Sequence, residues 1–137
     1  MTDIEDLARR VIDCGFHIHK RLGPGLLESV YETVLAASLT RDGMSVERQK
    51  PIPIEFEGLS ISDGFRADLV IEKSLIVEVK SVERTAPIHA KQLLTYLRLT
   101  EQPLGLLMNF GCETFREGLK RVVNGPSAFI PPPRIPI

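Results

Sequence analysis

Residues 65–80 read FRADLVIEKSLIVEVK, and this stretch contains two apolar runs joined by the polar segment Glu72-Lys73-Ser74. Both runs are short and rich in Val, Ile and Leu, which is typical of strands, and side chains in a strand alternate between its two faces. One face of the first arm then carries Phe65, Ala67, Leu69 and Ile71. A three-residue turn at 72–74 places Ile71 opposite Leu75, so the stretch predicts an antiparallel hairpin.

Each arm of this hairpin carries one acid among its apolar residues. Counting outward from the turn places Asp68 directly across from Glu78. The same count places Arg66 across from Lys80. A slip of one residue would send the two acids to opposite faces, so this prediction depends on the register.

Two acids in this position need an explanation. Like charges directly opposite each other, with Cβ atoms about 4.5–5.5 Å apart, are destabilising unless a cation neutralises them. Two carboxylates beside an ammonium group suggest Mg²⁺, which binds one or two carboxylates and keeps waters for a substrate phosphate. The alternative is a solvated polar face on which Lys80 and Arg66 pair with the acids. These two strands alone leave both interpretations open.

A helix is predicted upstream of the hairpin, at about residues 26–41. The sequence Leu22-Gly23-Pro24 breaks the preceding helix, and Gly43 ends this one. Glu28 and Tyr31 are three residues apart, so they are neighbours on one helical face. The helix therefore holds a third acid on a rigid element.

Another helix is predicted downstream of the hairpin, at residues 88–101, following Ala86-Pro87. Gln92 and Tyr96 are four residues apart and form a polar pair on this helix. We expect this polar face of the helix to face the acids of the hairpin.

The order of these polar residues along the chain resembles that of the PD-(D/E)XK nuclease superfamily. Its members carry an acid on the first core helix, an acid on one strand, an ExK motif on the next strand and a QxxxY-like element on the following helix. The matching residues here are Glu28, Asp68, Glu78-Val79-Lys80, Gln92 and Tyr96. ExK alone matches many surface strands by chance, whereas the ordered set is specific. One departure is that Ala67 precedes Asp68, so the proline of the superfamily's name is absent.

The spacing of Gly25, Glu28 and Tyr31 resembles the GxxExxY protein family within that superfamily, and the resemblance covers residues 4–124. It implies an α/β fold, a restriction-endonuclease-like sandwich with a mixed central β-sheet flanked by helices on both faces. It also implies a Mg²⁺-dependent nuclease that hydrolyses phosphodiester bonds of DNA, in preference to RNA. The alternative is a catalytically silent nuclease-fold protein that works as a binding or interaction module.

The resemblance implies the catalytic set Glu28, Asp68, Glu78, Lys80, Gln92 and Tyr96. Mg²⁺, for which Mn²⁺ can substitute, would be held by Asp68, Glu78 and the carbonyl of Val79. Glu28 would bind the metal directly or through water. Lys80 would orient the nucleophilic water and offset phosphate charge.

The two tyrosines have different expected roles. Tyr96, together with Gln92, would hydrogen-bond the scissile phosphate, the water or Lys80. Alternatively, both tyrosines cap the core and expose their hydroxyl groups, and for Tyr31 we favour this interpretation.

Composition limits the remaining choices. We expect one domain at residues 1–125 and a proline-rich extended tail at 126–137. No apolar run approaches ~18 residues and the N-terminus begins with acids, so we expect a soluble, cytoplasmic protein without membrane contact. Its two cysteines are too few for a zinc finger, and we expect no disulfide between them.

The net charge of the chain bears on whether nucleic acid is its binding partner. The formal net charge is −1, which counts modestly against a tight non-specific nucleic-acid binder and favours the silent alternative. The oligomeric state stays open between a monomer and a homodimer.

The other patterns complete the expected order of elements. They predict strands at residues 45–50, 52–57 and 104–110 and helices at 2–21 and 115–123. The second hairpin arm, the helix at 88–101 and the strand at 104–110 form a βαβ unit, which we expect to be parallel and right-handed.

Overall fold

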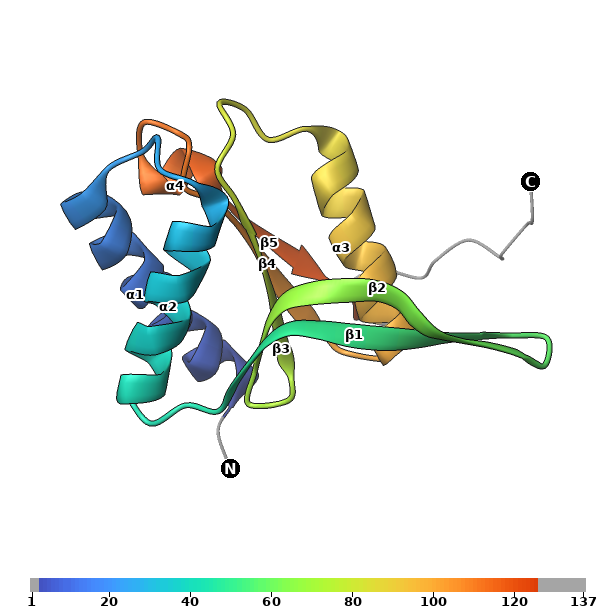
Figure 1. Cartoon of the computed structure of the whole chain (residues 1–137). Coiled ribbons are helices and arrows are strands. Elements are labelled where there is room, and N and C mark those ends of the chain that lie inside the picture. The colour runs from blue at the N-terminus through green and yellow to red at the C-terminus, as the bar shows by residue number, and fades with distance from the viewer. Residues whose placement is uncertain (1–2, 126–137) are drawn as a thin grey trace.

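The computed structural model describes residues 3–125 of the 137-residue chain. In chain order the elements are α1 (Ile4–Leu22), α2 (Glu28–Arg41), β1 (Val46–Phe56), β2 (Leu59–Ile71), β3 (Leu75–Lys80), α3 (Pro87–Thr100), β4 (Leu104–Asn109), α4 (Phe115–Gly118) and β5 (Leu119–Val123) (Figure 1). The tail predicted at 126–137 lies outside the described residues, so its conformation stays a prediction. No helix within residues 3–125 is long and apolar enough to cross a membrane.

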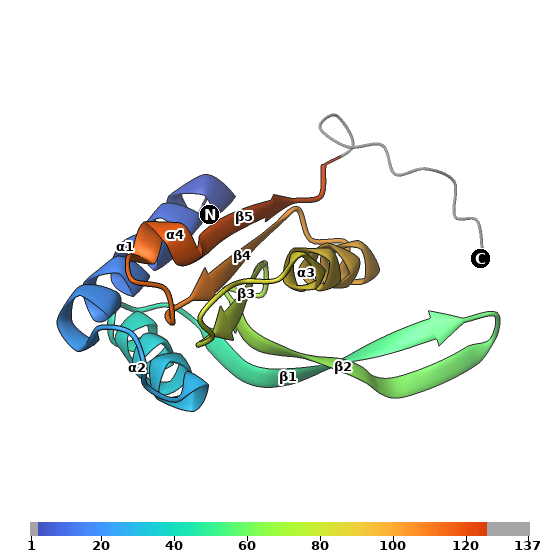
Figure 2. The same cartoon turned by 90° about the horizontal axis from the view of Figure 1, so that it is seen from above.

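In the described part of the chain the sheet has five strands, in the spatial order β1-β2-β3-β4-β5. Strands β3 and β4 are parallel, while the other three neighbouring pairs are antiparallel, so the sheet is mixed. Helices α1 and α2 lie on one face and α3 lies on the other (Figures 1 and 2). The predicted α/β sandwich with helices on both faces is therefore confirmed.

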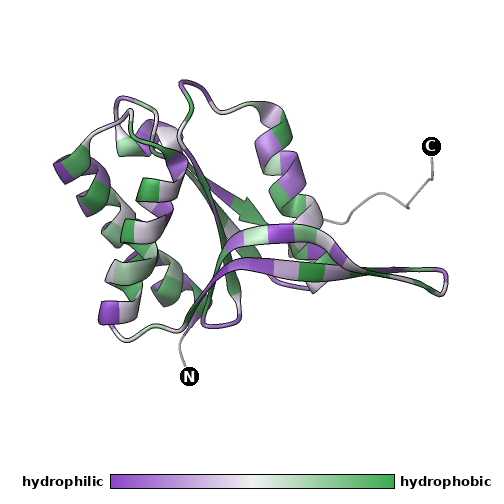
Figure 3. Ribbon diagram, in the orientation of Figure 1, coloured by the Kyte–Doolittle hydropathy of each residue, from purple (hydrophilic) through white to green (hydrophobic). Residues whose placement is uncertain are grey.

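The core consists of two apolar clusters, one on each face of the sheet. The larger cluster includes Val77, Val79 and Leu106 under α1 and α2, and the smaller one includes Ile76 and Leu107 with residues of α3. All six residues of β4 are buried, and the central strands are correspondingly hydrophobic (Figure 3). A strand buried on both faces is expected for the parallel pair at the centre of such a sandwich.

The β2–β3 hairpin has the predicted register. Ile71 is paired with Leu75, and the pairing continues to Leu69 and Val77. Glu72 and Lys73 adopt positive φ angles of 52° and 56°, the backbone of a tight hairpin turn. The next position outward is that of Asp68 and Glu78, so the local sequence does set the two acids against each other.

Two details of this hairpin were predicted wrongly. Arg66 is not paired with Lys80, because the β2–β3 ladder ends at Leu69 and Val77; the Arg66 guanidinium instead reaches Asp63, 3.4 Å away on the same strand. Ala67 packs in the smaller cluster beside α3, whereas Leu69 belongs to the larger cluster. The apolar residues of β2, expected on one face, therefore lie on both faces of the sheet. The cause is that β1 and β2 form a long ribbon that coils past α3 (Figure 1), and two-stranded ribbons twist strongly.

Strand β1 is continuous where two strands were predicted. The predicted break lay at Pro51, but β1 runs through both Pro51 and Pro53 to a turn at Glu57 and Gly58. β1 is an edge strand whose outer backbone has no ladder partner among residues 3–125, and a proline, which lacks an N–H, is tolerated at such an edge.

The helix predicted at residues 115–123 is also wrong beyond its first turn. Only Phe115–Gly118 is helical, and Leu119–Val123 forms β5 alongside β4. A Cβ added to Gly118 would lie 2.0 Å from the carbonyl oxygen of Asn109, so only glycine allows the two backbones to approach this closely. The apolar spacing of the segment fits either element, and its pairing with β4 decides for the strand.

Candidate active site where strands β2 and β3 diverge

The two hairpin acids lie where β2 separates from β3. Beyond the pair Leu69 and Val77, side chains replace backbone pairing: the backbone N–H of Asp68 donates to Glu78 Oε2 at 2.9 Å. In return the backbone N–H of Val79 donates to Asp68 Oδ2 at 2.8 Å. Each carboxylate is thus anchored by the opposite strand, and both are held at one end of the hairpin.

Glu78 is held in an environment that disfavours its charge. Its side chain is buried, and burial together with the nearby Asp68 raises the pKa of Glu78 to about 8. The Asp68 backbone N–H and the ammonium group of Lys80 act in the opposite direction. Burial and Asp68 outweigh Lys80 and the backbone N–H, so a bound proton or a further cation would stabilise Glu78.

Glu28 joins this group from the first turn of α2. Burial raises the pKa of Glu28, Lys80 lowers it, and the nearby charges of Asp68 and Glu32 raise it again. These interactions show that Glu28 and Lys80 lie at the same end of the sheet as the hairpin acids. The structure therefore brings together Glu28, Asp68, Glu78 and Lys80, and the Val79 carbonyl belongs to the same strand segment.

A buried tyrosine places Glu28 there. Tyr31 is fully buried and stacks on Phe110, with ring centroids 4.6 Å apart. Its hydroxyl donates to the carbonyl of Gly23 and accepts from the backbone N–H of Leu26 at 3.1 Å. The expectation that Tyr31 exposes its hydroxyl is wrong, since the hydroxyl fixes the loop before α2.

The same loop is attached to β3. Ser81 Oγ, directly after β3, donates to the carbonyl of Leu26 at 2.6 Å. Gly25 in this loop has a φ of 103°, a conformation that favours glycine. The spacing of Gly25, Glu28 and Tyr31 thus has a structural reason: a turn, the acid that it positions, and the tyrosine that holds the turn.

Replacing Tyr31 with phenylalanine is expected to destabilise the protein by about 1–3 kcal/mol, because two part-buried hydrogen bonds to the backbone, at the Gly23 carbonyl and the Leu26 N–H, are lost. Urea unfolding followed by circular dichroism measures this change. Thr95→Val is the matched control, since the Thr95 hydroxyl is exposed on α3 and bonds only the Lys91 carbonyl within the described residues. Equal midpoints for Tyr31→Phe and wild type would show that the hydroxyl does not hold the loop.

Tyr96 approaches the acids from α3. Its ring stacks on Phe65 of β2, with centroids 3.8 Å apart and planes 8° from parallel. Burial raises the pKa of the Tyr96 hydroxyl, and the charges of Glu78 and Asp68 raise it further. Gln92 lies one turn before Tyr96 on the same helix and is exposed. Only this spacing of four residues associates Gln92 with the site.

One contributor to the site was not predicted from the sequence. Gln49 of β1 contacts Asp68, and it also contacts Glu32, a buried acid one turn after Glu28 on α2. The sequence offered one signal for this contact: Glu28 and Glu32 are four residues apart and therefore lie on one face of the helix.

The residues present fit a divalent cation. Asp68 and Glu78 offer the hard oxygen donors that Mg²⁺ prefers, and Mg²⁺ is commonly bound by one or two carboxylates with waters. Within residues 3–125 no group of three or more His, Cys, Asp or Glu side chains is arranged as a metal site. A pair of carboxylates, with Glu28 nearby, is consistent with an ion that keeps several of its waters.

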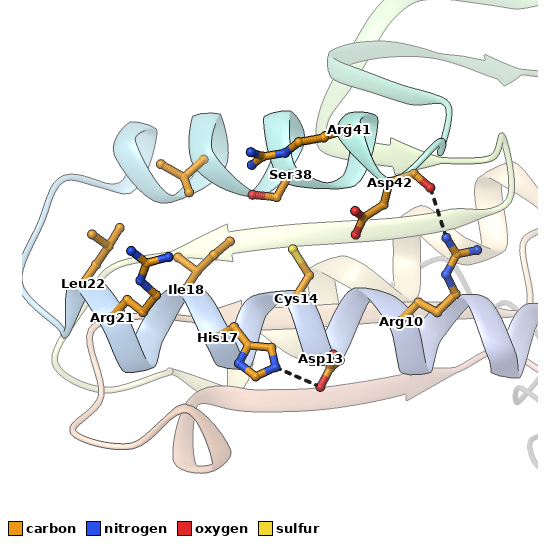
Figure 4. A pocket seen from close by; sticks show the side chains of 11 residues that line it. Arg10, Asp13, Cys14, His17, Ile18, Arg21, Leu22, Ser38, Arg41 and Asp42 are labelled. Carbon is orange, nitrogen blue, oxygen red and sulfur yellow. Dashed lines mark hydrogen bonds and ion pairs between the residues drawn. The ribbon is translucent and has the colours of Figure 1, made fainter.

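Cavities lie beside the loop before α2 and between α1 and α2. An open cavity of about 410 Å³ includes Glu28 in its lining but neither Asp68 nor Glu78; it is lined by Gly25, Leu26, Leu27, Glu28, Ser81, Val82, Glu83 and Gly111. Another, of about 460 Å³, lies between α1 and α2 and has Arg10, Arg21 and Arg41 in its lining (Figure 4). Asp13 and Asp42 offset much of that positive charge, and none of the six predicted catalytic residues lines this second cavity.

A mixed sheet with helices on both faces (Figures 1 and 2) defines the fold class of the protein as restriction-endonuclease-like. A family model for the PD-(D/E)XK nuclease superfamily matches residues 5–122, and the chain belongs to that superfamily. No curated protein and no solved structure matches the chain.

In the metal-free protein, Glu78 is expected to make stability depend on pH. Its folded pKa of about 8 lies above the ordinary value of 4.5, so the folded state binds the extra proton. The stability contribution is fully present below about pH 4.5 and is lost as pH rises through about 8, by a total of about 5 kcal/mol. Urea unfolding in EDTA between pH 5 and pH 9 measures the loss.

Glu78→Gln is the matched variant for this measurement, because it keeps the shape of the side chain and cannot ionise. Wild type should lose stability relative to Glu78→Gln as pH rises. A constant difference between the two proteins over this range would contradict the expectation.

Proposed function

We propose that the protein is a Mg²⁺-dependent nuclease that hydrolyses phosphodiester bonds of DNA, with Mn²⁺ as a substitute metal. The observation that carries this proposal is the convergence of Glu28, Asp68, Glu78 and Lys80 at one end of the sheet. Membership of the nuclease superfamily supports hydrolysis and nucleic-acid binding. The preference for DNA over RNA is part of the proposal.

Asp68, Glu78 and the Val79 carbonyl would hold the ion, and Glu28 would bind it directly or through water. When bound, Mg²⁺ supplies charge stabilisation at the phosphate and lowers the pKa of a bound water. The two carboxylates are held in place by backbone N–H groups before any ion arrives, so little rearrangement is needed.

The other residues act on the substrate. In hydrolysis, a water oxygen bonds to phosphorus and gives up one proton to the solvent, the bond to the leaving oxygen breaks, and that oxygen takes up one proton from the solvent. The Lys80 ammonium group would orient the attacking water and offset the negative charge that grows on the phosphate oxygens. Tyr96 and Gln92 would donate hydrogen bonds to the phosphate from α3, which lies on the opposite face of the sheet from α2 (Figures 1 and 2).

We further propose that the chain is a member of the GxxExxY family within the superfamily. Gly25, Glu28 and Tyr31 support this assignment, because each has a distinct role in bringing the acid to the site. We place its activity in the cytoplasm.

The test combines metal binding with cleavage. Isothermal titration calorimetry should show heat on addition of Mg²⁺ or Mn²⁺ to the full-length protein. Single-turnover assays should then show metal-dependent cleavage of single-stranded, duplex or branched DNA, with RNA as the comparison. Folded protein that gives no heat at millimolar metal and cleaves none of these substrates would refute the proposal.

A second candidate is a catalytically silent interaction module that forms a homodimer. The observation that favours it is the β1–β2 hairpin, which extends beyond α3 (Figures 1 and 2) and exposes Phe56 and Leu59 to 64% and 60%. Glu55 and Glu57 flank these residues, so the hairpin end suits a protein surface better than DNA. Light scattering should then report a dimer that Phe56→Ser dissociates, and a monomer at all concentrations would exclude this candidate.

A further inference from the structure

We propose that Gln49 is a positioning residue of the metal site, whose side-chain amide fixes the orientation in which Asp68 receives the ion. This inference rests on the proposed function, because it concerns the same site. Gln49 lies on β1, is separated from Asp68 by 19 positions in sequence, and belongs to no motif that the sequence indicated.

The amide of Gln49 lies between two carboxylates. Its Nε2 is 2.7 Å from Glu32 Oε1 and 3.1 Å from Asp68 Oδ1. Carboxylates only accept hydrogen bonds, so the NH₂ side of the amide must face both of them. One N–H then goes to each acid, and the amide cannot itself be a metal ligand through that side.

These contacts leave Asp68 with little freedom. Gln49 donates to Oδ1, and the backbone N–H of Val79 donates to Oδ2 at 2.8 Å. With both oxygens held, rotation of the carboxylate is restricted and its remaining lone pairs have fixed directions. Groups behind a metal ligand that restrict it in this way raise metal affinity, because the ligand needs no reorganisation.

Gln49 is itself anchored through Glu32. Glu32 is 5% exposed, and its other oxygen, Oε2, accepts from Nε and Nη2 of Arg48 at 3.2 and 3.1 Å. Both oxygens of Glu32 are therefore engaged by neighbouring residues of β1. The contacts form a continuous chain from α2 through β1 to Asp68 on β2.

The backbone of β1 adopts an unusual conformation to make these contacts. Gln49 has a φ of 48°, in the left-handed region, although it is not glycine. Arg48 and Lys50 on either side keep their pairing with Leu69 and Ala67. A left-handed residue between two paired neighbours in a strand is strained, and such strain persists where the surroundings hold it in place.

The decisive variant is Gln49→Gly. Glycine adopts the left-handed conformation without strain, and this gain offsets the contact that Glu32 Oε1 loses with the amide, so the melting temperature is expected to change little. Calorimetry with Mn²⁺ on the full-length protein is expected to show a dissociation constant raised by about tenfold or more. Gln49→Asn keeps an amide and tolerates the backbone, but its side chain is one methylene shorter and should show a similar loss. Gln102→Ala is the control, since the Gln102 amide contacts the Lys73 carbonyl.

A purely structural role would lower the melting temperature and leave the affinity of the folded protein unchanged. Gln49→Gly and Gln49→Asn that bind Mn²⁺ as tightly as wild type would overturn the inference and leave the proposed function intact. Wild type that binds no Mn²⁺ would overturn both. Weaker binding in both Gln49 variants, at unchanged melting temperature and with normal Gln102→Ala, supports the inference.

Discussion

Asp68→Asn is expected to abolish detectable metal binding and to slow DNA cleavage by about 10³-fold or more. The change removes one of the two charges that would hold the ion. It also breaks the contacts around the side chain: if the new amide oxygen accepts from Val79, its NH₂ faces the NH₂ of Gln49, donor against donor. The variant therefore loses both the negative charge and the fixed orientation.

The measurements are calorimetry with Mg²⁺ and single-turnover cleavage of the best substrate found for wild type. Asp63→Asn is the matched control, because Asp63 is an exposed acid on the same strand, paired with Arg66. It should bind metal and cleave DNA as wild type does. Cleavage by Asp68→Asn at the rate of the control would mean that the acids at the hairpin opening are not the catalytic centre.

The hairpin shows why part of the site was predictable. Its register depends on a short turn and on the period of two along a strand, both of which are local properties of residues 65–80. Asp68 and Glu78 could therefore be paired without knowledge of the rest of the chain. The prediction that Ala67 shares one apolar face with Leu69 was wrong, because the coiling of β1 and β2 past α3 is a property of the whole ribbon.

The position of Glu28 was only half predictable. Its helix and its neighbour Tyr31 follow from spacing, but its approach to Lys80 depends on contacts between distant segments. These are the hydrogen bonds of Tyr31 to the preceding loop and of Ser81 to Leu26. No local pattern in the sequence encodes a contact across 55 positions.

Gln49 could not be predicted by the same rules. A left-handed residue inside a strand is usually glycine or asparagine, and glutamine gives no such signal. The helix prediction for the segment that forms β5 was wrong for a different reason. The apolar positions of Leu119–Val123 suit a helix or a strand equally. In both cases the deciding interactions are tertiary: Gln49 with two acids, and Gly118 against the backbone of Asn109.

Lys80→Met is expected to separate catalysis from metal binding. Methionine preserves most of the apolar stem of lysine and removes the ammonium group. Cleavage should fall by about 10²–10³-fold, because the charge that grows on the phosphate loses one stabilising cation. Lys80 is not a metal ligand, so metal affinity should change by less than about tenfold, in contrast to Asp68→Asn.

Two effects on affinity oppose each other in this variant. The Lys80 ammonium group lowers the pKa of both Glu28 and Glu78, so its loss makes these acids harder to ionise. Its loss also removes a positive charge that repels the incoming cation. Lys120→Met, a change at an exposed lysine on β5, controls for the loss of one positive charge. If Lys80→Met cleaves DNA as fast as Lys120→Met, the ammonium group has no part in the reaction, and the metal site alone must account for any activity.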